Sequence, residues 1–593
     1  MKILLCASHH ALTIGYSRVA YNIATWLHAH GHTVVYFAFS NFEPHLNIDR
    51  TLPAGIEIVD TFALHRARSD PEAEKSARPD MTPAELELHK TVHGQREHHY
   101  GKADMAATVR DKQPDLVLIY NDVFVVSMLL AELPRGPTRP KIAVYLDQVY
   151  PLQSHHIIKH IAFNVDHIIM FSDYWRTKMI EYGFDAGMCS VLRHGIDPPL
   201  QIDRRRARRR LRKVLPQIGA DDFLVLNSNR NVHRKAWDIT IFGFLEFLRR
   251  ANYDPLVKLC ANTLTNDIGV YDLVELISAG TMHLRIVDRT VPQLLQQHFV
   301  FSTNLTDTQL QLLYAACDVG VNTCLGEGVG LCSLEHASHG KPQIATRAGG
   351  LVDIFREHPE CLLDPKVTMY SPRNLDPHGG ILAICDYADV ATRLTQLYSE
   401  YAPLRFDIKR WLWPRVLKRL SVLDSVRRRL VIDVTTTRRA AMQRARMQFM
   451  GPVVDHFVVL DPRRRALKGC TVLADADDIA GAFSPTAHPD SLVICGEPEM
   501  LTHPAAIVDV AFRLVDLVAL RSQMPVLSRN MKAVKRMAPG STYRRLRDTI
   551  PPDAPIINGA GWTLSAEPAA AGDRPFDAPP ELQRLRAFLK PRQ

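Results

Sequence analysis

Residues 326–350, GEGVGLCSLEHASHGKPQIATRAGG, combine carboxylates and glycines in a pattern that suits a ligand with phosphate groups. A predicted strand at 319–323 runs into a glycine-bearing turn, and a predicted helix follows from about residue 330 to 339. Gly328 and Gly330 let the backbone approach a ligand closely, because glycine has no Cβ. The free N–H groups at a helix start bind anions. The stretch therefore predicts a diphosphate site at the start of this helix.

Two glutamates, Glu327 and Glu335, accompany that predicted helix start. Glu327 comes before the helix, and Glu335 lies in its second turn. Carboxylates accept strong hydrogen bonds from pairs of hydroxyl groups. One glutamate can meet the hydroxyls of a sugar while the other meets a ribose. The alternative is that both are ordinary surface carboxylates, but the neighbouring glycines favour a binding site.

Two cations in residues 227–238, NSNRNVHRKAWD, are placed where they could neutralise such a diphosphate. Arg230 and Lys235 follow a predicted strand and precede a predicted helix. Open α/β sheets bind their ligands at the carboxyl ends of the strands. Positive charge placed there stabilises a departing diphosphate. The alternative for both side chains is a solvated surface.

Short apolar runs alternate with helical patterns in two series. The predicted strands of the first series are 2–8, 32–40, 115–121, 141–147 and 167–172. Those of the second series are 223–229, 256–262, 283–288, 319–323 and 342–347. Strands rich in Val and Ile that alternate with helices form parallel sheets covered on both faces. We therefore predict an α/β protein with two facing, doubly wound, Rossmann-like domains over residues 1–200 and 201–400.

The remainder of the chain divides into three further segments. We expect residues 401–426 to form a helix that returns to pack on the first domain. Residues 427–561 contain strand-like runs and predict a smaller accessory α/β region, and residues 562–593 read as a loose tail. The run ADADD includes Asp475 and Asp477, a spacing that can bind a metal ion together with a diphosphate. This spacing is short and common, so we favour a structural or partner-binding role for the accessory region.

The order of these motifs resembles the GT-B glycosyltransferases, specifically the retaining family 4 (glycosyl transferases group 1), over residues 1 to about 425. Glu327 and Glu335 match the family's E-x7-E motif, and EGVGLCSLE stands where EGFGL-type sequences are usual. Arg230 and Lys235 match its paired diphosphate-binding cations. In addition, IGYSRVAYNIA at 14–24 resembles the glycine loop of its first domain, and LRHGID at 192–197 resembles the end of that domain.

The resemblance implies a transferase that moves a sugar from a nucleotide-diphospho-sugar to a hydroxyl of a glycan, lipid or protein. Arg230 and Lys235 would hold the diphosphate, and Glu327 would position the sugar. A donor phosphate oxygen would take the proton of the acceptor, with retention of anomeric configuration. The family needs neither a metal nor another cofactor. The other residues implied to contact the donor are Gly15, Gly328, Val329, Gly330, Leu331 and Glu335.

The sequence departs from the family pattern at three positions. Many relatives have a His after the strand that corresponds to 141–147, whereas this chain has Asp147. Glycosyl transfer passes through an oxocarbenium-like state, whose positive charge Asp147 could stabilise. A strand-end cap is an equally good reading of Asp147. Ser17 replaces a common glycine, and His336 replaces the usual small residue after the second glutamate.

The charge of the chain is concentrated in one segment. Of the formal net charge of +9 over 593 residues, eight units come from RRRARRRLRK at 204–213, which leaves +1 for the remainder. A general nucleic-acid-binding surface needs basic residues spread over a face, so none is expected. We expect an exposed linker helix at 204–213, with contact to anionic lipids as an alternative and nuclear targeting or local nucleic-acid contact as a further one.

Other features favour a reduced, cytoplasmic protein. None of the ten cysteines forms a CxxC pair, and several lie in apolar runs, which predicts buried thiols. The most apolar stretch, 123–133, is too short to cross a bilayer. His89 and His93 share a helical spacing that could bind a metal, but no third ligand is spaced to complete a site, so a solvated helix is preferred.

Two further possibilities remain open at this stage. A catalytically silent sugar-nucleotide-binding or scaffold protein, and a sugar-nucleotide epimerase, would use the same donor site. Three segments, 435–442, 468–470 and 491–500, also resemble faintly the ordered motifs of the family 25 glycosyltransferases. Gly496, Glu497 and Pro498 stand where that family has an acidic pair, which implies a degenerate second transferase.

Overall fold

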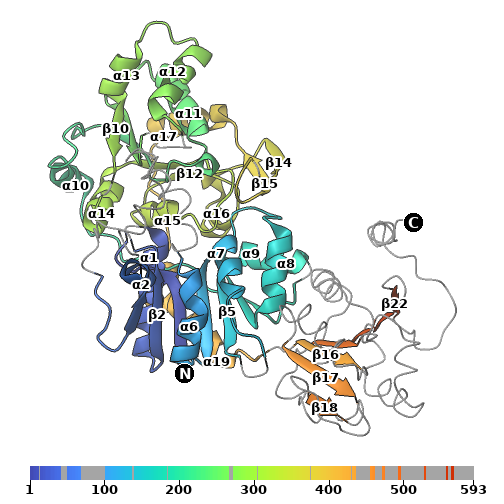
Figure 1. The fold of residues 1–593 in the computed structure, drawn as a ribbon. Helices are drawn as coiled ribbons and strands as arrows, with labels where there is room; N and C mark the ends of the chain where they lie inside the picture. The colour runs from blue at the N-terminus through green and yellow to red at the C-terminus, as the bar shows by residue number, and fades with distance from the viewer. Residues whose placement is uncertain are drawn as a thin grey trace, which may run out of the picture.

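The computed structural model describes most of residues 1–428 and seven short strands beyond them. The positions not described within the first part are 13, 42–49, 69–99, 137–138, 183, 266–270, 304, 374. The described residues form two α/β domains, one above the other in Figure 1, with a third sheet beside the first domain.

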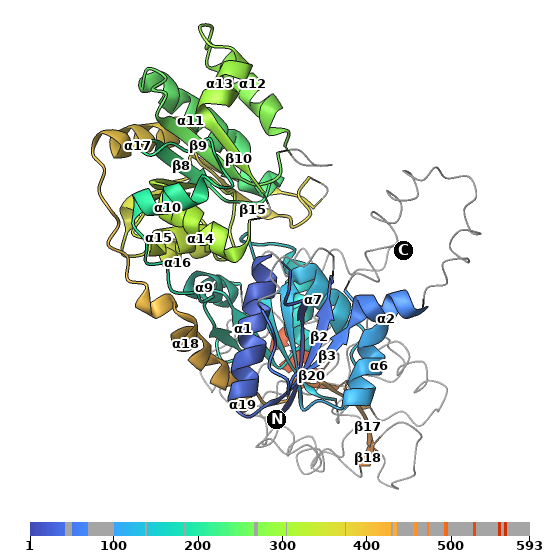
Figure 2. The same cartoon turned by 90° about the vertical axis from the view of Figure 1, so that its left-hand side faces the viewer.

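The first domain is built on a parallel sheet in the order β3-β2-β1-β4-β5-β6-β7. Its strands are β1 Lys2–Ser8, β2 Thr33–Phe39, β3 Glu57–Asp60, β4 Leu116–Asp122, β5 Lys141–Asp147, β6 His167–Met170 and β7 Cys189–Val191. Its helices are α1 Gly15–Ala29, α2 Thr61–Arg68, α6 Lys102–Lys112, α7 Val123–Leu130, α8 His155–Asn164 and α9 Asp173–Glu181. The central strands are buried along both faces, because α1 and α6 cover opposite sides of the sheet (Figure 2).

The second domain has a parallel sheet in the order β10-β9-β8-β11-β12-β13 and a separate antiparallel hairpin, β14-β15. Its strands are β8 Phe223–Asn227, β9 Val257–Asn262, β10 Phe299–Ser302, β11 Val319–Asn322, β12 Gln343–Thr346, β13 Leu362–Leu363, β14 Val367–Ser371 and β15 Gly380–Ile384. Its helices are α10 Arg204–Leu211, α11 Trp237–Arg250, α12 Leu273–His283, α13 Val291–His298, α14 Asp307–Ala316, α15 Leu331–Ser338, α16 Gly350–Ile354 and α17 Tyr387–Ser399, with the single turns η2 His233–Lys235 and η3 Pro359–Cys361.

The predicted fold class is confirmed: both sheets are parallel, doubly wound and joined by helices, as in GT-B proteins. Most predicted strands and the capping box of α14, between Thr306 and Gln309, are also present. The strand predicted at 283–288 is wrong. Arg285 adopts a left-handed backbone with φ of 54° just after α12, and such a conformation does not continue into a strand. The edge strand of this sheet is β10 instead.

Residues 401–426 run back along the first domain as short helical turns (Figure 2). These turns are η4 Lys409–Trp411, α18 Trp413–Val416, η5 Leu417–Ser421 and α19 Val422–Ser425. Trp411, Trp413 and Leu420 are buried in the core of the first domain. The segment therefore ties the end of the second domain to the first.

The third sheet has the order β18-β17-β16-β19-β20-β21-β22, with only the β21–β22 pair antiparallel. Its strands are β16 Val431–Thr435, β17 His456–Leu460, β18 Thr471–Leu473, β19 Leu492–Cys495, β20 Val526–Ser528, β21 Ile556–Asn558 and β22 Thr563–Ser565. Asp455, next to β17, accepts a hydrogen bond of 3.0 Å from Arg139 of the first domain, and Arg139 also pairs with Asp166 at 2.7 Å. These buried charges join the accessory sheet to the first domain.

The basic run at 204–213 forms α10, but it is not exposed all round. Arg208 is 1% exposed, and Ala207 and Leu211 are buried on the same face. The expectation of a fully exposed linker helix is therefore corrected: one face of α10 packs on the second domain, because Arg208 finds a buried carboxylate partner there, Asp318.

Several other expectations can be compared with the described residues. Eight cysteines in this part of the chain are free thiols, and all but Cys332 are buried. No helix among the described residues is long and apolar enough to cross a membrane. His89, His93, Asp475 and Asp477 lie outside the described residues, as do most of the segments that resemble family 25.

Candidate active site

The candidate site lies where the order of the second sheet reverses. β8 and β11 are neighbours there, although the chain leaves them toward opposite edges of the sheet. Loops that follow two such strands separate and leave a crevice at their carboxyl ends. The loop after β8 carries the cations at 230–235, and the loop after β11 carries residues 323–330. The topology therefore brings together two motifs that are far apart in the sequence. Lys235 and Glu327, which are in contact, are separated by 92 positions.

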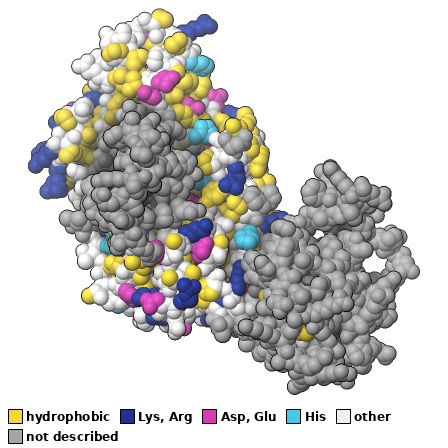
Figure 3. Space-filling model, viewed as in Figure 1, with side chains coloured by type: hydrophobic (Ala, Val, Ile, Leu, Met, Phe, Trp, Pro, Cys, Tyr) yellow, Lys and Arg dark blue, Asp and Glu magenta, His cyan; other side chains and the backbone are white. Residues whose placement is uncertain are grey.

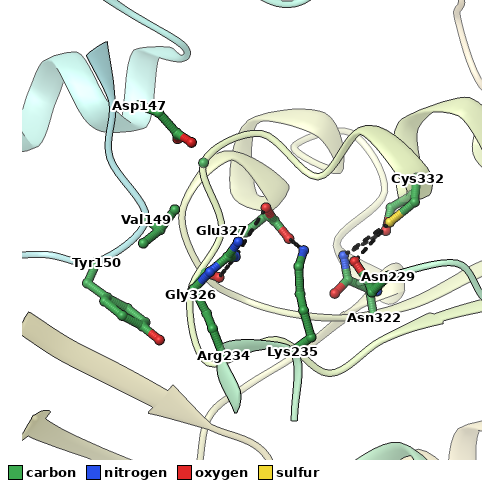
Figure 4. Close-up of polar contacts among 12 residues, drawn as sticks. Asp147, Val149, Tyr150, Asn229, Arg234, Lys235, Asn322, Gly326, Glu327 and Cys332 are labelled. Carbon is green, nitrogen blue, oxygen red and sulfur yellow. Dashed lines mark hydrogen bonds and ion pairs between the residues drawn. The ribbon is translucent and has the colours of Figure 1, made fainter. Parts of the chain in front are cut away.

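Glu327 is the centre of a buried charge cluster. The Lys235 ammonium donates a hydrogen bond to its Oε2 atom, and Arg234 Nη1 lies 3.5 Å from its Oε1 atom (Figure 4). Arg234 also donates to the carbonyl oxygen of Gly326 at 2.8 Å. Burial opposes ionisation, but the two cations outweigh it and hold the pKa of Glu327 below its usual range. The site thus holds a charged carboxylate and two cations in one buried cluster.

The single turn η2 orients the two cations. Ala236, which follows it, has a left-handed backbone with φ of 45° and separates η2 from α11. Arg234 and Lys235 therefore point toward Glu327 instead of continuing along α11 (Figure 4). Lys235 is buried, at 7% exposure.

Arg230, the other cation predicted from sequence, lies at the start of this loop and is exposed. Its carbonyl oxygen accepts a hydrogen bond of 3.2 Å from the indole of Trp237. Its positive charge acts on His378, whose pKa is lowered mainly by burial. Arg234 is the arginine beside Glu327. Sequence reasoning missed Arg234, although its position next to Lys235 was an available signal.

The glycines near Glu327 set the backbone of the turn. Gly330 precedes α15 with a φ of 95°, a left-handed conformation that favours glycine. Val329 is buried and Leu331, the first residue of α15, is partly buried. A side chain at Gly15, at the start of α1, would come within 3.1 Å of Leu331. The predicted glycine loop of the first domain therefore lies against the start of α15.

Asp147, at the end of β5, faces this turn from the first domain. A Cβ atom at Gly328 would collide with Asp147 Oδ1, so the two domains approach closely here (Figure 4). The Tyr16 hydroxyl donates a hydrogen bond to Asp147 Oδ2, whereas Oδ1 is buried and has no hydrogen-bond partner in the described part of the chain. Burial raises the pKa of Asp147 to about 6, although Tyr16 and Arg234 oppose the shift. The carboxyl group therefore changes its charge closer to neutral pH than an ordinary aspartate does.

Glu335 is buried between the domains. Arg18 of α1 donates a hydrogen bond to its Oε1 atom, and the Tyr314 hydroxyl donates to Oε2 at 2.9 Å. Burial raises the pKa of Glu335, and Arg18 and Tyr314 partly offset this effect. Both carboxylate oxygens are therefore engaged by protein groups in this structure, whereas the sequence resemblance implied that Glu335 contacts the donor.

A second set of contacts joins the two domains near Arg234. Tyr150, which follows β5, donates a hydrogen bond of 2.8 Å to Asp376 in the loop between β14 and β15. Ser154 donates to the carbonyl oxygen of His378 in the same loop at 2.7 Å. A Cβ atom at Gly326 would collide with the Tyr150 ring. Sequence reasoning missed this contact, because neither side of it carries a recognisable motif.

The described residues contain no group of three or more His, Cys, Asp or Glu side chains that could hold a metal ion. The charged groups at the site are instead the cations Arg234 and Lys235 with the carboxylates Glu327 and Asp147. This arrangement can bind an anionic group and place a carboxylate on each side of a sugar.

Comparison with known proteins agrees with this architecture. Residues 240–371 match the family described as Glycosyl transferases group 1. The matched segment contains β11, the turn with Glu327 and all of α15, so the resemblance predicted from sequence is confirmed for the core of the second domain. The comparison with curated proteins gave no significant match.

Several solved structures are similar to this chain at low sequence identity. HepE from Anabaena, in complex with UDP and glucose, is 17% identical with a TM-score of 0.48, over 72% of this chain and 99% of that chain. Sucrose-phosphate synthase from Thermosynechococcus elongatus is 16% identical with a TM-score of 0.49, over 72% and 98% of the two chains. A trehalose-phosphate synthase from Burkholderia xenovorans, in complex with glucose-6-phosphate, is 11% identical with a TM-score of 0.45, over 72% and 99%.

Proposed function

We propose that this protein is a retaining glycosyltransferase that moves a sugar from a nucleotide-diphospho-sugar to a hydroxyl of a glycan, lipid or protein. The observation that carries the proposal is the buried cluster of Lys235, Arg234 and Glu327, which lies where the strand order of the second sheet reverses. Glu327 also lies within residues 240–371, the segment that matches glycosyl transferases group 1. Cations at that position are suited to a diphosphate leaving group.

In the proposed mechanism, the diphosphate binds at the start of α15 and next to Lys235. Arg230, which is exposed at the start of the loop after β8, also binds the diphosphate. Glu327 accepts hydrogen bonds from sugar hydroxyls. The acceptor enters from the first domain, and a donor phosphate oxygen takes the proton of its hydroxyl group as the new glycosidic bond forms on the leaving-group side. Asp147, in its ionised form, stabilises positive charge on the sugar. Closure of the domains excludes water from the activated sugar.

The charges on the protein support a reaction without a metal or other cofactor. Lys235 and Arg234 already supply two positive charges beside Glu327. Positive charge held in place before the reaction stabilises the leaving group without reorganisation. The nucleotide sugar is then a co-substrate.

The first experiment is a thermal-shift screen against UDP-, GDP- and ADP-sugars, followed by an assay of nucleotide release. A ligand at a hundred times its dissociation constant stabilises the native protein by about 2.7 kcal/mol. Stabilisation by one nucleotide class, and acceptor-dependent release that Glu327→Gln abolishes, would support the proposal. The anomeric configuration of the product, read by NMR, tests retention. Absence of any shift in a folded protein would refute the donor site.

One observation favours a second candidate function, a catalytically silent sugar-nucleotide sensor or scaffold. Arg18 and Tyr314 occupy both oxygens of Glu335, the carboxylate that the resemblance assigns to the donor. A donor that cannot displace these groups would bind without being turned over. Donor binding without nucleotide release across a broad acceptor panel would favour this alternative.

A further inference from the structure

The cations of the basic run at 204–213 fall into two sets. One set forms hydrogen bonds with the second domain, and the other set does not. The inward set, defined by its hydrogen bonds to the second domain, is Arg204, Arg208 and Arg212, spaced four residues apart; of these, only Arg208 is buried, and the other two remain exposed. Arg204 and Arg208 each donate a hydrogen bond of 2.7 Å to one oxygen of Asp318. Arg212 donates to the carbonyl oxygen of Ile218 at 2.6 Å. These bonds fix the rotation of α10 about its own axis.

The outward set consists of the five remaining cations of the run. They are Arg205, Arg206, Arg209, Arg210 and Lys213. All five are exposed, and none forms an ion pair with a residue that the structure describes. Because Ala207 and Leu211 are buried on the opposite face, these cations share one side of a helix that cannot turn them inward. We call this set the α10 basic face.

The α10 basic face lies at the edge of the molecule and is followed by an exposed apolar residue. Dark blue side chains protrude at the left of Figure 3, where Figure 1 places α10. Val214, just after the helix, is 44% exposed. Cations next to an exposed aliphatic side chain are suited to a membrane surface, where the apolar group can enter the boundary between headgroups and acyl chains.

We propose that the α10 basic face binds an anionic membrane surface and holds the protein there. Five unpaired cations, four on α10 and one just after it, can reach a flat surface together. Each cation near an anionic bilayer strengthens binding by about fivefold. The site is separate from the charge cluster around Glu327, so it adds an attachment function whatever reaction the cleft performs.

Two features favour a membrane over a nucleic acid as the partner. The cations are confined to one short helix, whereas the rest of the chain has a net charge of only +1. A nucleic-acid strand is held by a basic groove that follows its backbone over several nucleotides and by aromatic side chains that stack on successive bases. The convex surface of α10 offers no such row of stacking groups.

The test measures co-sedimentation of the full-length protein with vesicles of phosphatidylcholine alone and with added phosphatidylglycerol. The wild type should bind only the anionic vesicles, and less at high salt, because salt screens exposed charges. The double variant R209Q/R210Q removes two outward cations and leaves the inward bonds intact. It should bind about 25-fold more weakly.

A matched control carries the same charge change elsewhere. Arg110 on α6 and Arg285 after α12 are both exposed, so R110Q/R285Q should bind as the wild type does. Thermal unfolding should show that both variants are folded. Equal loss in the control, or no binding of the wild type to anionic vesicles, would overturn the proposal. Tighter binding to a single-stranded oligonucleotide than to vesicles would also overturn it and make nucleic acid the partner.

Discussion

Arg18 of the first domain pairs with Glu335 of the second, although 317 positions separate them in the sequence. The side chains are 14% and 5% exposed, so the pair is shielded from water. Arg18 also lies 3.8 Å from Asp307 at the start of α14, and Arg50 pairs with the same Asp307 at 2.9 Å. The two domains are thus joined by charges on one side of the cleft, at the carboxylate that the family resemblance assigns to the donor.

We predict that Arg18→Gln lowers stability without donor but increases the response to donor. Loss of one partner from a buried ion pair costs about 3–5 kcal/mol, because the other charge stays buried. Donor hydroxyls can then take the place of Arg18 at Glu335. Thermal unfolding should show a lower midpoint for the free variant and a larger donor-induced increase than in the wild type.

The control for this prediction is Arg110→Gln, which removes an exposed cation from the same domain. Its midpoint should stay close to that of the wild type, with a change of about 0.5 kcal/mol or less. If Arg18→Gln instead abolishes the donor-induced shift, Arg18 belongs to the donor site and does not compete with the donor.

A second prediction separates the two arginines of the loop after β8. Arg234 contacts the Glu327 carboxylate and the Gly326 carbonyl, whereas Arg230 is exposed. Arg234→Ala should lower kcat by about 100-fold or more, the usual effect of removing a group that stabilises developing negative charge. Arg230→Ala should mainly raise KM for the donor, because in the proposed mechanism its exposed side chain binds the diphosphate without contacting Glu327.

Steady-state nucleotide release with both variants checks this difference. Circular dichroism should first establish that each variant is folded. A larger loss of kcat in Arg230→Ala than in Arg234→Ala would contradict the assignment and restore the pairing implied by the sequence resemblance.

The sequence predicted those parts of the site that depend on local patterns. Glycines and the helix start placed Glu327 correctly next to a turn, and the position after a strand placed Lys235 near the sheet edge. Arg234 was missed because the rotation of η2, set by the left-handed Ala236, decides which cation faces inward. The pair Arg18–Glu335 was missed because it forms only when the two domains meet, and the pair Tyr16–Asp147 was missed because it joins α1 to β5 across 131 positions of the sequence. Local periodicity carries no information on such contacts.

A third prediction concerns metal dependence. Lys235 and Arg234 supply the positive charge beside Glu327. Nucleotide release in an excess of EDTA should therefore equal that in buffer alone within about twofold, since fixed cations can replace a metal at a diphosphate. A rate that falls with EDTA and recovers on addition of Mg²⁺ or Mn²⁺ would contradict the proposed mechanism.

The fourth prediction is a pH dependence set by Asp147, whose pKa burial raises to about 6. The ionised form is the one that can stabilise positive charge on the sugar. Activity should therefore rise as pH increases through about 6 and level off above it. Asp147→Asn should have low activity and lose this limb of the profile. Wild-type activity that stays constant between pH 5 and 7 would count against Asp147. That pH range includes the raised pKa of Asp147 and lies above the ordinary pKa of a carboxyl group.

The same carboxyl group should also affect stability, with a defined sign. An acid whose folded pKa is raised binds its proton more tightly in the native than in the unfolded state, so stability falls as pH rises from about 4 to about 6. The loss amounts to roughly 3 kcal/mol above that range. Asp147→Asn should therefore raise the thermal midpoint at pH 8 but not at pH 4, which thermal unfolding at the two pH values will check.

The fifth prediction tests the division of the basic run by its two faces. Arg208 is buried and donates hydrogen bonds to Asp318 at 2.7 Å and to the Ala316 carbonyl at 3.0 Å, whereas Arg209 next to it is exposed. Arg208→Ala leaves a buried carboxylate with one arginine fewer and should cost about 3 kcal/mol. Arg209→Ala removes the same charge and should change stability by less than about 0.5 kcal/mol. Thermal unfolding of both variants checks this difference. Equal changes in stability would mean that α10 has no packed face and that its exposed cations do not share one side of the helix.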